Sequence, residues 1–242
     1  MKSATGQALG RLLALPSSLA DVVFPATCRS CGVPIASSEC LCSTCTEALV
    51  YVEPDRCQAC GRIGRFQPCP GCGFDVRPVE QLYSCFSYGG PIADAIIDFK
   101  RSGDPFTARF LARAMASDEQ LRSWDIEILL PVPLHPARLR RRGFNQSALL
   151  ARTLGKILGI PVEFACLERA LDTPRQADMP DAKARLDNVK EAFRVARPEK
   201  IEGRKVCLVD DVVTTGSTIA ACARDLAAAG ADKVFAAAAS QR

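Results

Sequence analysis

The chain has 242 residues, which is enough for one large domain or two small ones. Charged residues make up 24% and hydrophobic residues 48%, as is ordinary for a globular protein, and the net charge of +4 permits a nucleic-acid or phosphate partner without demanding one. No stretch of about 18 apolar residues runs without a charge, so the composition excludes a membrane span.

Residues 1–22 form an apolar lead-in to the chain. Its apolar run, from Leu9 to Leu15, contains Arg11 and stops at Pro16. A basic leader with a clean cleavage site is missing from this stretch. We therefore predict a short amphipathic helix here and not a signal peptide.

Residues 23–78 are rich in cysteine, glycine and proline, and their apolar pattern is too poor to bury a core without cross-links. Nine of the 13 cysteines lie in this stretch, eight of them in Cys-x-x-Cys pairs. An odd total argues against a disulfide scaffold, and the paired spacing favours metal binding in a cytoplasmic protein. The predicted ligands are Cys28, Cys31, Cys42, Cys45, Cys57, Cys60, Cys69 and Cys72.

Eight thiolates in four pairs predict two zinc ions, because a structural zinc site takes four sulfurs and leaves no open position for catalysis. The simplest pairing is sequential, with the first four ligands on one ion and the last four on the other. Iron–sulfur ligation and a redox dithiol are the alternatives, and Cys40 is a spare thiol close to Cys42. We expect Cys85, Cys166, Cys207 and Cys222 to be small core residues.

From residue 80 onward, apolar strand-like runs alternate with amphipathic helical runs, which predicts an α/β fold with a mainly parallel sheet flanked by helices. Asn145 can cap one of the helices, and Gly230 can end another. The polar stretch 171–188 reads as a long loop. We expect strands at 126–132, 161–165, 205–209 and 234–239, and helices at 145–158 and 217–229.

The segment 206–218 carries the strongest functional signal. A buried strand ends at Asp210 and Asp211, and a loop rich in Thr, Ser and Gly then leads into a helix. Backbone N–H groups and hydroxyls at a helix N-terminus bind a phosphate monoester, and the two carboxylates suit ribose hydroxyls. The rival interpretations are a plain helix cap and two solvated aspartates. The segment contains neither a Walker P-loop nor a dinucleotide-binding glycine motif.

This segment resembles the motif with which type I phosphoribosyltransferases bind 5-phosphoribosyl-1-diphosphate (PRPP). The resemblance implies that Asp210 and Asp211 hold the ribose 2′- and 3′-hydroxyls and that the following loop holds the 5′-phosphate. The implied PRPP-binding residues are Asp210, Asp211, Val212, Val213, Thr214, Thr215, Gly216, Ser217 and Thr218.

A second resemblance, to the ComF competence family, covers the chain from about residue 24 to its end. It is carried by 130–146, by Thr173-Pro-Arg-Gln-Ala with its continuation to Phe193, by Asp98-Phe-Lys100 and by the zinc-ribbon cysteines. It implies a double zinc-ribbon module at 23–78, a phosphoribosyltransferase domain at 80–242 and a role in DNA uptake.

The basic stretch 138–142 is predicted as a loop between a strand and a helix. Its position resembles that of the pyrophosphate-binding loop of type I enzymes, which implies diphosphate binding by Arg138, Arg141, Arg142, Asn145 and Gln146. A nucleic-acid patch and a solvated basic loop are the alternatives. We expect the only histidine, His135, to have a loop or packing role.

Two functional hypotheses follow from these resemblances. In the first, PRPP binds as a magnesium complex and its phosphoribosyl group passes to a nitrogen acceptor with release of pyrophosphate. In the second, the protein keeps PRPP or nucleotide binding for regulation and handles single-stranded DNA with a competence helicase. A zinc-stabilised interaction module is a weaker third, and a homo-oligomer is compatible with each. The loop residues expected to close over the site are Arg175, Gln176, Arg185 and Asn188.

Overall fold

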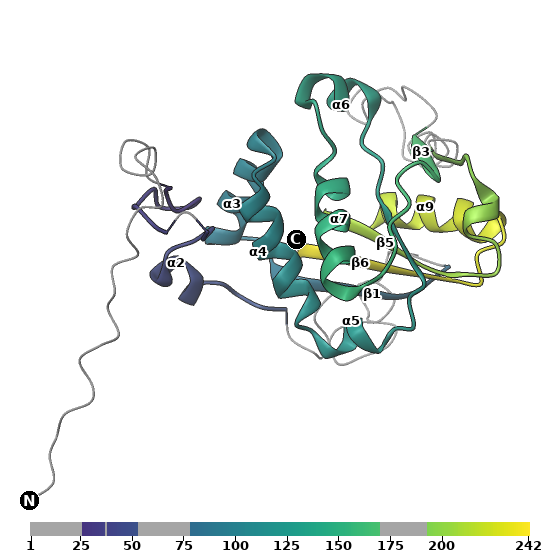
Figure 1. The fold of residues 1–242 in the computed structure, drawn as a ribbon, viewed down its shortest axis with the longest axis horizontal. Coiled ribbons are helices and arrows are strands. Elements are labelled where there is room, and N and C mark those ends of the chain that lie inside the picture. The colour runs from purple at the N-terminus through teal and green to yellow at the C-terminus, as the bar shows by residue number, and fades with distance from the viewer. Residues whose placement is uncertain (1–25, 37, 53–77, 170–192) are drawn as a thin grey trace, which may run out of the picture.

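The computed structural model describes residues 26–36, 38–52, 78–169 and 193–242 (Figure 1). Three predictions lie outside these residues: the helix at 1–22, the four cysteines from Cys57 to Cys72, and the loop residues from Arg175 to Asn188. Within the described part of the chain, no helix is long and apolar enough to cross a membrane.

Among the described residues, a four-stranded parallel sheet forms the centre of the fold. Its strand order is β1 (Val79–Ser87), β6 (Lys233–Gln241), β5 (Lys205–Val213) and β2 (Ile128–Pro131). The register aligns the apolar side chains in rows, because Leu208 pairs with both Ala236 and Leu130. The predicted parallel α/β sheet is confirmed.

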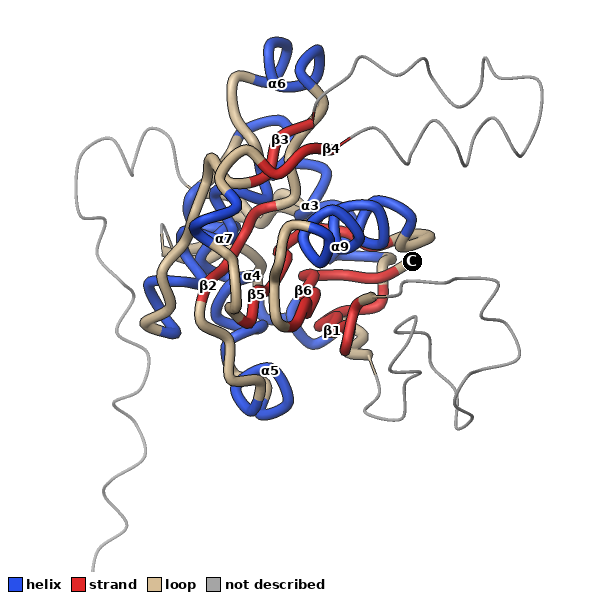
Figure 2. Tube along the Cα trace, turned by 90° about the vertical axis from the view of Figure 1, so that its right-hand side faces the viewer, coloured by secondary structure: helices blue, strands red, loops and turns tan. Residues whose placement is uncertain are grey.

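Helices cover both faces of this sheet (Figure 2). On β5, Cys207 and Val209 belong to the core beneath α3 (Gly90–Ser102), α4 (Pro105–Ala116) and α7 (Gln146–Leu158). The alternate residues Val206 and Leu208 belong to the core beneath α9 (Ser217–Ala228). Both faces are buried, so the strand is apolar along much of its length instead of alternating.

Smaller elements surround this core. A two-stranded antiparallel ribbon stands beside α9, and short helices connect the larger elements. Their bounds are α2 (Ser43–Glu47), α5 (Glu119–Ser123), α6 (Pro136–Arg142), β3 (Leu167–Arg169), β4 (Phe193–Val195) and the 3₁₀ turn η2 (Pro198–Lys200).

The predicted secondary structure agrees best with the observed one where a capping residue sets the end of a helix. Asn145 accepts a hydrogen bond from the Ser147 N–H and caps α7 as predicted. Gly230, with φ of 93°, follows the end of α9. The strand predicted at 161–165 is wrong: only Val162 forms a bridge, with Leu129, and the next strand begins at Leu167. Cys85, Cys166, Cys207 and Cys222 are buried core residues, as expected.

Gly155 lets α7 approach the edge of the sheet closely. A Cβ atom at this position would lie 2.5 Å from Val162 Cγ2 and 2.7 Å from the Ile160 carbonyl oxygen. Alanine normally stabilises a helix relative to glycine by about 1 kcal/mol, but overpacking against backbone costs about 1–3 kcal/mol. Because one of the two clashes is with backbone, we expect the upper part of that cost, so Gly155→Ala should lower the free energy of unfolding by about 1–2 kcal/mol in a denaturant titration. The exposed neighbour Lys156→Ala is the control, and a variant as stable as wild type would contradict this packing.

Candidate functional site

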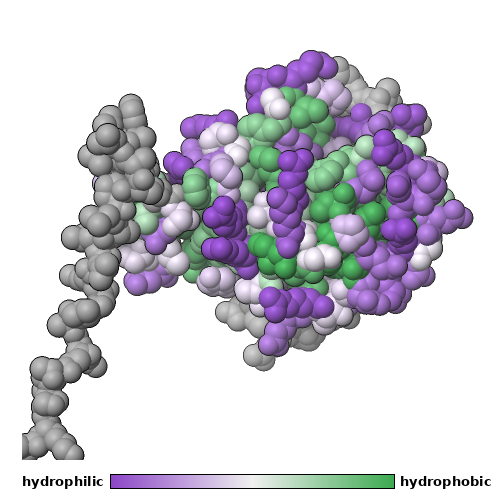
Figure 3. Space-filling view, viewed as in Figure 1, coloured by the Kyte–Doolittle hydropathy of each residue, from purple (hydrophilic) through white to green (hydrophobic). Residues whose placement is uncertain are grey.

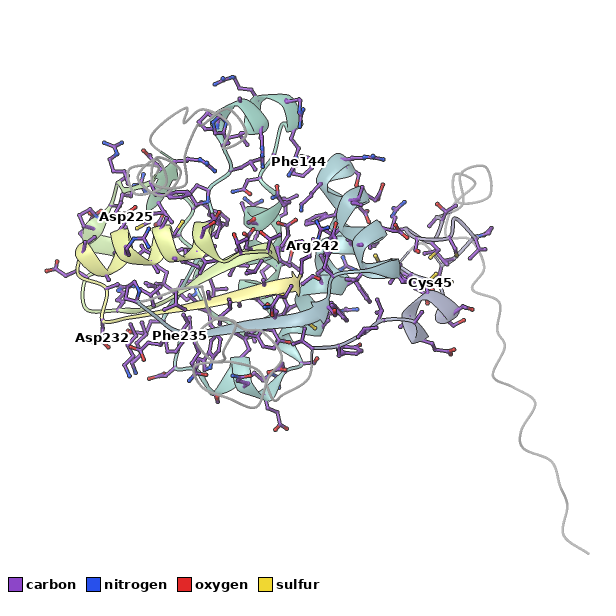
Figure 4. The ribbon with its side chains drawn as sticks, turned by 180° about the vertical axis from the view of Figure 1, so that it is seen from behind. Cys45, Phe144, Asp225, Asp232, Phe235 and Arg242 are labelled. Atoms are coloured by element: carbon purple, nitrogen blue, oxygen red, sulfur yellow. The ribbon has the colours of Figure 1, made fainter. Side chains whose placement is uncertain are left out.

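The two aspartates predicted at the strand end lie at the carboxyl edge of the sheet. The strand does not end at them, because β5 continues to Val213 and pairs there with Gln241 of β6. The connecting loop is therefore short, and Gly216, with φ of 74°, is the N-cap of α9. Figure 4 marks this edge at Arg242, at the opposite end of β6 from Asp232.

The structure disagrees with the interpretation as a plain helix cap, and it buries one of the two aspartates. Gly216 occupies the N-cap of α9, and no side chain caps the helix, so the Thr- and Ser-rich turn is not a plain cap. Asp211 is 3% exposed, so it is not a solvated aspartate. Thr214 and Thr215 are exposed, and the Thr215 and Ser217 hydroxyl oxygens lie 3.1 Å apart. The loop therefore presents hydroxyls at the N-terminus of a helix, which suits an anion.

Asp210 is held by α7 and by its own neighbour. The Ser147 hydroxyl donates a hydrogen bond of 2.8 Å to Asp210 Oδ1, and the Asp211 N–H donates one of 2.9 Å to the same oxygen. Burial, followed by the adjacent Asp211 carboxylate, raises the pKa of Asp210 well above its usual range. Two carboxyl groups are thus held close together at some electrostatic cost, a pattern common in functional sites.

Asp211 is surrounded by cationic and amide groups from three elements. Lys100 Nζ, on α3, lies 2.9 Å from Asp211 Oδ2. Gln146 Nε2 donates to Asp211 Oδ1 at 3.4 Å, and the Arg142 guanidinium in turn donates to Gln146 Oε1. The structure thus brings together Asp211, Arg142 and Gln146, which the sequence marked for different parts of one ligand.

Lys100 and Ser147 are contacts that the sequence analysis did not assign. Lys100 stands in the Asp98-Phe-Lys100 motif, which carried the family resemblance but no role. Ser147 follows the capping residue Asn145, whose amide group donates to the Val132 carbonyl oxygen. The sequence around each residue indicated only its local role. Their partners lie far along the chain on β5, 111 positions from Lys100 and 63 from Ser147.

The basic stretch predicted as a loop is a helix. In α6, Pro136 is the first residue, His135 Nδ1 caps the helix by accepting from the Ala137 N–H, and Gly143 ends it with φ of 83°. These are ordinary helix boundary signals, so the loop prediction was wrong. His135 has the local structural role that was expected of it. Figure 3 shows a hydrophilic surface over α6.

A cationic cleft lies between α6 and α3. Its volume is about 460 Å³, and four of the five described residues that line it carry positive charge. Since Lys100 is one of them, the cleft adjoins Asp211. The lining residues are Ile97, Lys100, Arg101, Arg141 and Arg142.

The two walls of the cleft meet at Gly103 and Phe144. Gly103 ends α3 with φ of 65°, and a Cβ atom there would lie 3.1 Å from the Phe144 ring. Phe144 joins α6 to α7 and lies between α6 and α3 in Figure 4. This contact holds the C-terminal end of α3 against the segment that joins α6 to α7.

The first two cysteine pairs form one cluster. The sulfurs of Cys28, Cys31, Cys42 and Cys45 all lie within 4.8 Å of one another, and those of Cys31 and Cys42 are 3.7 Å apart. Tetrahedral zinc with bonds of about 2.3 Å places neighbouring sulfurs about 3.8 Å apart, so these residues fit the ion. Burial raises the pKa of Cys28, but N–H groups of the surrounding backbone outweigh it and lower the pKa to about 6, which favours the thiolate.

Cys40, the spare thiol, lies outside this cluster. Its sulfur is 3.5 Å from the Thr107 hydroxyl on α4, and burial raises its pKa to about 11. It is therefore a packing residue, and the ambiguity between Cys40 and Cys42 is resolved in favour of Cys42.

No family model matches the chain. DNA utilization protein YhgH of Salmonella typhimurium is 34% identical over 221 residues, which cover 88% of this chain and 96% of that protein. Competence protein F of Haemophilus influenzae is 31% identical over 202 residues, or 80% of this chain and 87% of that protein.

Solved structures with a similar chain path include phosphoribosyltransferases. The glutamine PRPP amidotransferase from B. subtilis has a TM-score of 0.39 and 21% identity, covering 54% of this chain and 25% of its own. An adenine phosphoribosyltransferase also has a TM-score of 0.39, with 17% identity, covering 62% of this chain and 76% of its own. The chain belongs to the ComF family, which includes DNA utilization protein YhgH and competence protein F.

Proposed function

We propose that this protein binds PRPP with Mg²⁺ at the carboxyl edge of its sheet and works in DNA utilization or competence, as the names of its relatives suggest. One observation carries the proposal. Asp210 and Asp211 are neighbouring carboxyl groups, and Asp211 contacts Lys100, one of the four cationic side chains that line the cleft among the described residues. A sugar that carries phosphate groups at both ends matches this division of charge.

In this proposal each part of PRPP contacts protein groups that complement it in charge or hydrogen bonding. The ribose hydroxyls donate hydrogen bonds to Asp210 and Asp211, and the 5′-phosphate accepts from the loop 214–218 at the start of α9. The diphosphate enters the cleft and draws Lys100 from Asp211 onto its oxygens. Mg²⁺ suits carboxylate and phosphate oxygens and, when bound with PRPP, supplies positive charge to the diphosphate.

The chemistry proposed for this arrangement is phosphoribosyl transfer. The bond between the ribose C1 and the diphosphate oxygen breaks, and the cationic walls stabilise the charge that collects on the leaving pyrophosphate. A nitrogen acceptor attacks C1 and loses its proton to solvent. We test this by measuring pyrophosphate released from PRPP in the presence of purine and pyrimidine bases. If no base gives release above the background rate, transfer is refuted and only the binding function remains.

We assign the domains accordingly: a zinc-ribbon module at 23–78 and a phosphoribosyltransferase domain at 80–242.

A second candidate function, single-stranded DNA binding, is favoured by α6. Arg138, which was predicted to bind pyrophosphate, and Arg140 lie on this helix, are exposed and are not among the described residues that line the cleft. They are free to contact a DNA backbone while Arg141 and Arg142 face the cleft.

The two pairs of arginines on α6 therefore separate the two functions. We expect Arg141→Ala/Arg142→Ala to weaken Mg²⁺–pyrophosphate binding about tenfold or more, because charge-assisted hydrogen bonds are lost. We expect Arg138→Ala/Arg140→Ala to leave pyrophosphate binding unchanged and to weaken single-stranded DNA binding with a shallower salt dependence. Calorimetry and fluorescence anisotropy measure the two affinities. Equal effects of both pairs on pyrophosphate would contradict the assignment of the cleft.

A further inference from the structure

We infer that Arg29, which lies within the cysteine cluster, is a positioning residue for the cationic cleft and couples metal binding at the cluster to anion affinity at the cleft. The inference rests on the proposed function, because it concerns the same diphosphate site. It assigns a role to a residue that touches neither the ligand nor the metal. The link between the two sites is the helix α3.

One face of α3 contacts the residues of the cysteine cluster through a hydrogen bond and an ion pair. Asp94 and Asp98 are four residues apart and so share this face. The Ser30 hydroxyl donates a hydrogen bond of 2.8 Å to Asp94 Oδ2, and Arg29 Nε lies 3.6 Å from Asp98 Oδ2. Both Arg29 and Ser30 lie between the metal ligands Cys28 and Cys31, so the cluster and α3 are in direct contact.

Arg29 also reaches the start of the next helix. Its Nε lies 3.4 Å from Asp104 Oδ2, and Asp104, 8% exposed, caps α4 by accepting from the Thr107 N–H. The Arg29 backbone N–H donates to the Cys40 carbonyl oxygen at 3.0 Å, and the Cys40 sulfur lies 3.5 Å from the Thr107 hydroxyl. One guanidinium group thus bridges the end of α3 and the start of α4.

Three other side chains of α3 line the cleft. Ile97, Lys100 and Arg101 form one wall, and Lys100 reaches Asp211. The cysteine cluster lies beyond the same end of the sheet as this edge, as the positions of Cys45 and Arg242 show in Figure 4. A shift of α3 therefore moves the cationic groups of the cleft against those of α6.

Arg29 should favour anion binding at the cleft both through its charge and through its effect on the position of α3. Arg29 offsets the carboxylates of Asp98 and Asp104, which lie near Lys100 and Arg101 in the chain and would otherwise attract them away from an anion. Asp98 is 37% exposed and Arg29 27%, so solvent screens much of this charge effect. The larger part is positional, because a bound metal fixes the loop that carries Arg29.

The test uses the full chain with zinc bound and Mg²⁺–pyrophosphate as the probe. We expect Arg29→Ala to keep its zinc but to weaken pyrophosphate binding about fivefold or more in calorimetry. Arg29→Lys should restore most of the affinity. Arg113→Ala, an exposed arginine on α4, is the matched control and should bind as wild type does. Ser30→Ala, a milder change to the same contact, should weaken binding in the same direction.

A double-mutant comparison separates positioning from general destabilisation. Because Arg29 acts through α3, its removal should weaken binding much less in a Lys100→Met background than in wild type. Hydrogen exchange in residues 90–102 should become faster in Arg29→Ala, while exchange in α7 stays unchanged.

Full additivity of the two substitutions, or wild-type affinity in the zinc-bound Arg29→Ala protein, would overturn the inference and leave the proposed function intact. A wild-type protein that binds neither pyrophosphate nor PRPP would contradict both.

Discussion

Replacing both carboxylates of β5, as Asp210→Asn/Asp211→Asn, is expected to weaken PRPP binding about 100-fold or more. Each lost hydrogen bond between a charged group and a hydroxyl costs about 1.5–3 kcal/mol, and two are lost together. Asparagine keeps the shape of the side chain, so the fold should survive. Isothermal calorimetry with PRPP and Mg²⁺ measures the change, and Asp232→Asn, on the exposed turn before β6, is the control.

The same variant should bind Mg²⁺–pyrophosphate no more weakly than wild type. Asp211 holds Lys100 at 2.9 Å, and loss of its charge frees the ammonium group for the diphosphate. The opposite behaviour of PRPP and pyrophosphate is the informative result, because a misfolded protein would lose both ligands. A variant that is folded by circular dichroism and loses both ligands equally, or one that keeps wild-type PRPP affinity, would refute the assignment of Asp210 and Asp211 to the sugar.

The carboxylate of Asp210 should lower the stability of the folded protein. The pKa of Asp210 is raised in the folded protein, so the native state favours the protonated carboxyl group. The stability that this proton gives the native state is lost as the pH rises through the raised pKa. We expect Asp210→Asn to be more stable than wild type at pH 8 by about 0.5–2 kcal/mol and to lose this advantage in acid.

The second large effect is expected at the cysteine cluster. Structural zinc contributes about 10–16 kcal/mol to the folding of isolated zinc-finger peptides, and here the cluster also packs into the core beneath α3 and α4. Substitution of Cys45 by serine should therefore remove one zinc ion per chain and lower the unfolding temperature by tens of degrees. Elemental analysis and thermal unfolding measure the two effects.

Cys40→Ser is the matched control for this prediction. Cys40 is equally buried and lies between the same pairs, but its sulfur faces Thr107, so zinc content should not change. With all eight predicted ligands, the wild type should contain about two zinc ions per chain, and the Cys45→Ser variant about one. Iron in place of zinc, or loss of zinc in Cys40→Ser, would refute the ligand assignment.

The parts of the fold that sequence predicts here are those with a local physical cause. Apolar runs buried on both faces marked β5 and β6, and the amide of Asn145 marked the start of α7. The arginines of α6 are good helix formers between a proline and a glycine, and the emphasis on their charge hid that pattern.

The missed contacts depend on tertiary structure. Lys100 meets Asp211 only because α3 crosses beside the carboxyl edge of the sheet, and nothing near Lys100 in the sequence encodes that crossing. The same holds for Arg29, whose partners Asp98 and Asp104 lie about 70 residues further on. Motif resemblance marked Lys100 but not Arg29, and the fold supplied the partners of both.

The most direct measurement is a crystal structure of the protein with PRPP and Mg²⁺. The account predicts the ribose hydroxyls within hydrogen-bond distance of Asp210 and Asp211, the 5′-phosphate at the N-terminus of α9, and the diphosphate between Lys100 and Arg142. PRPP seated elsewhere, or an unaltered Lys100–Asp211 ion pair with no ligand at saturating PRPP, would contradict it.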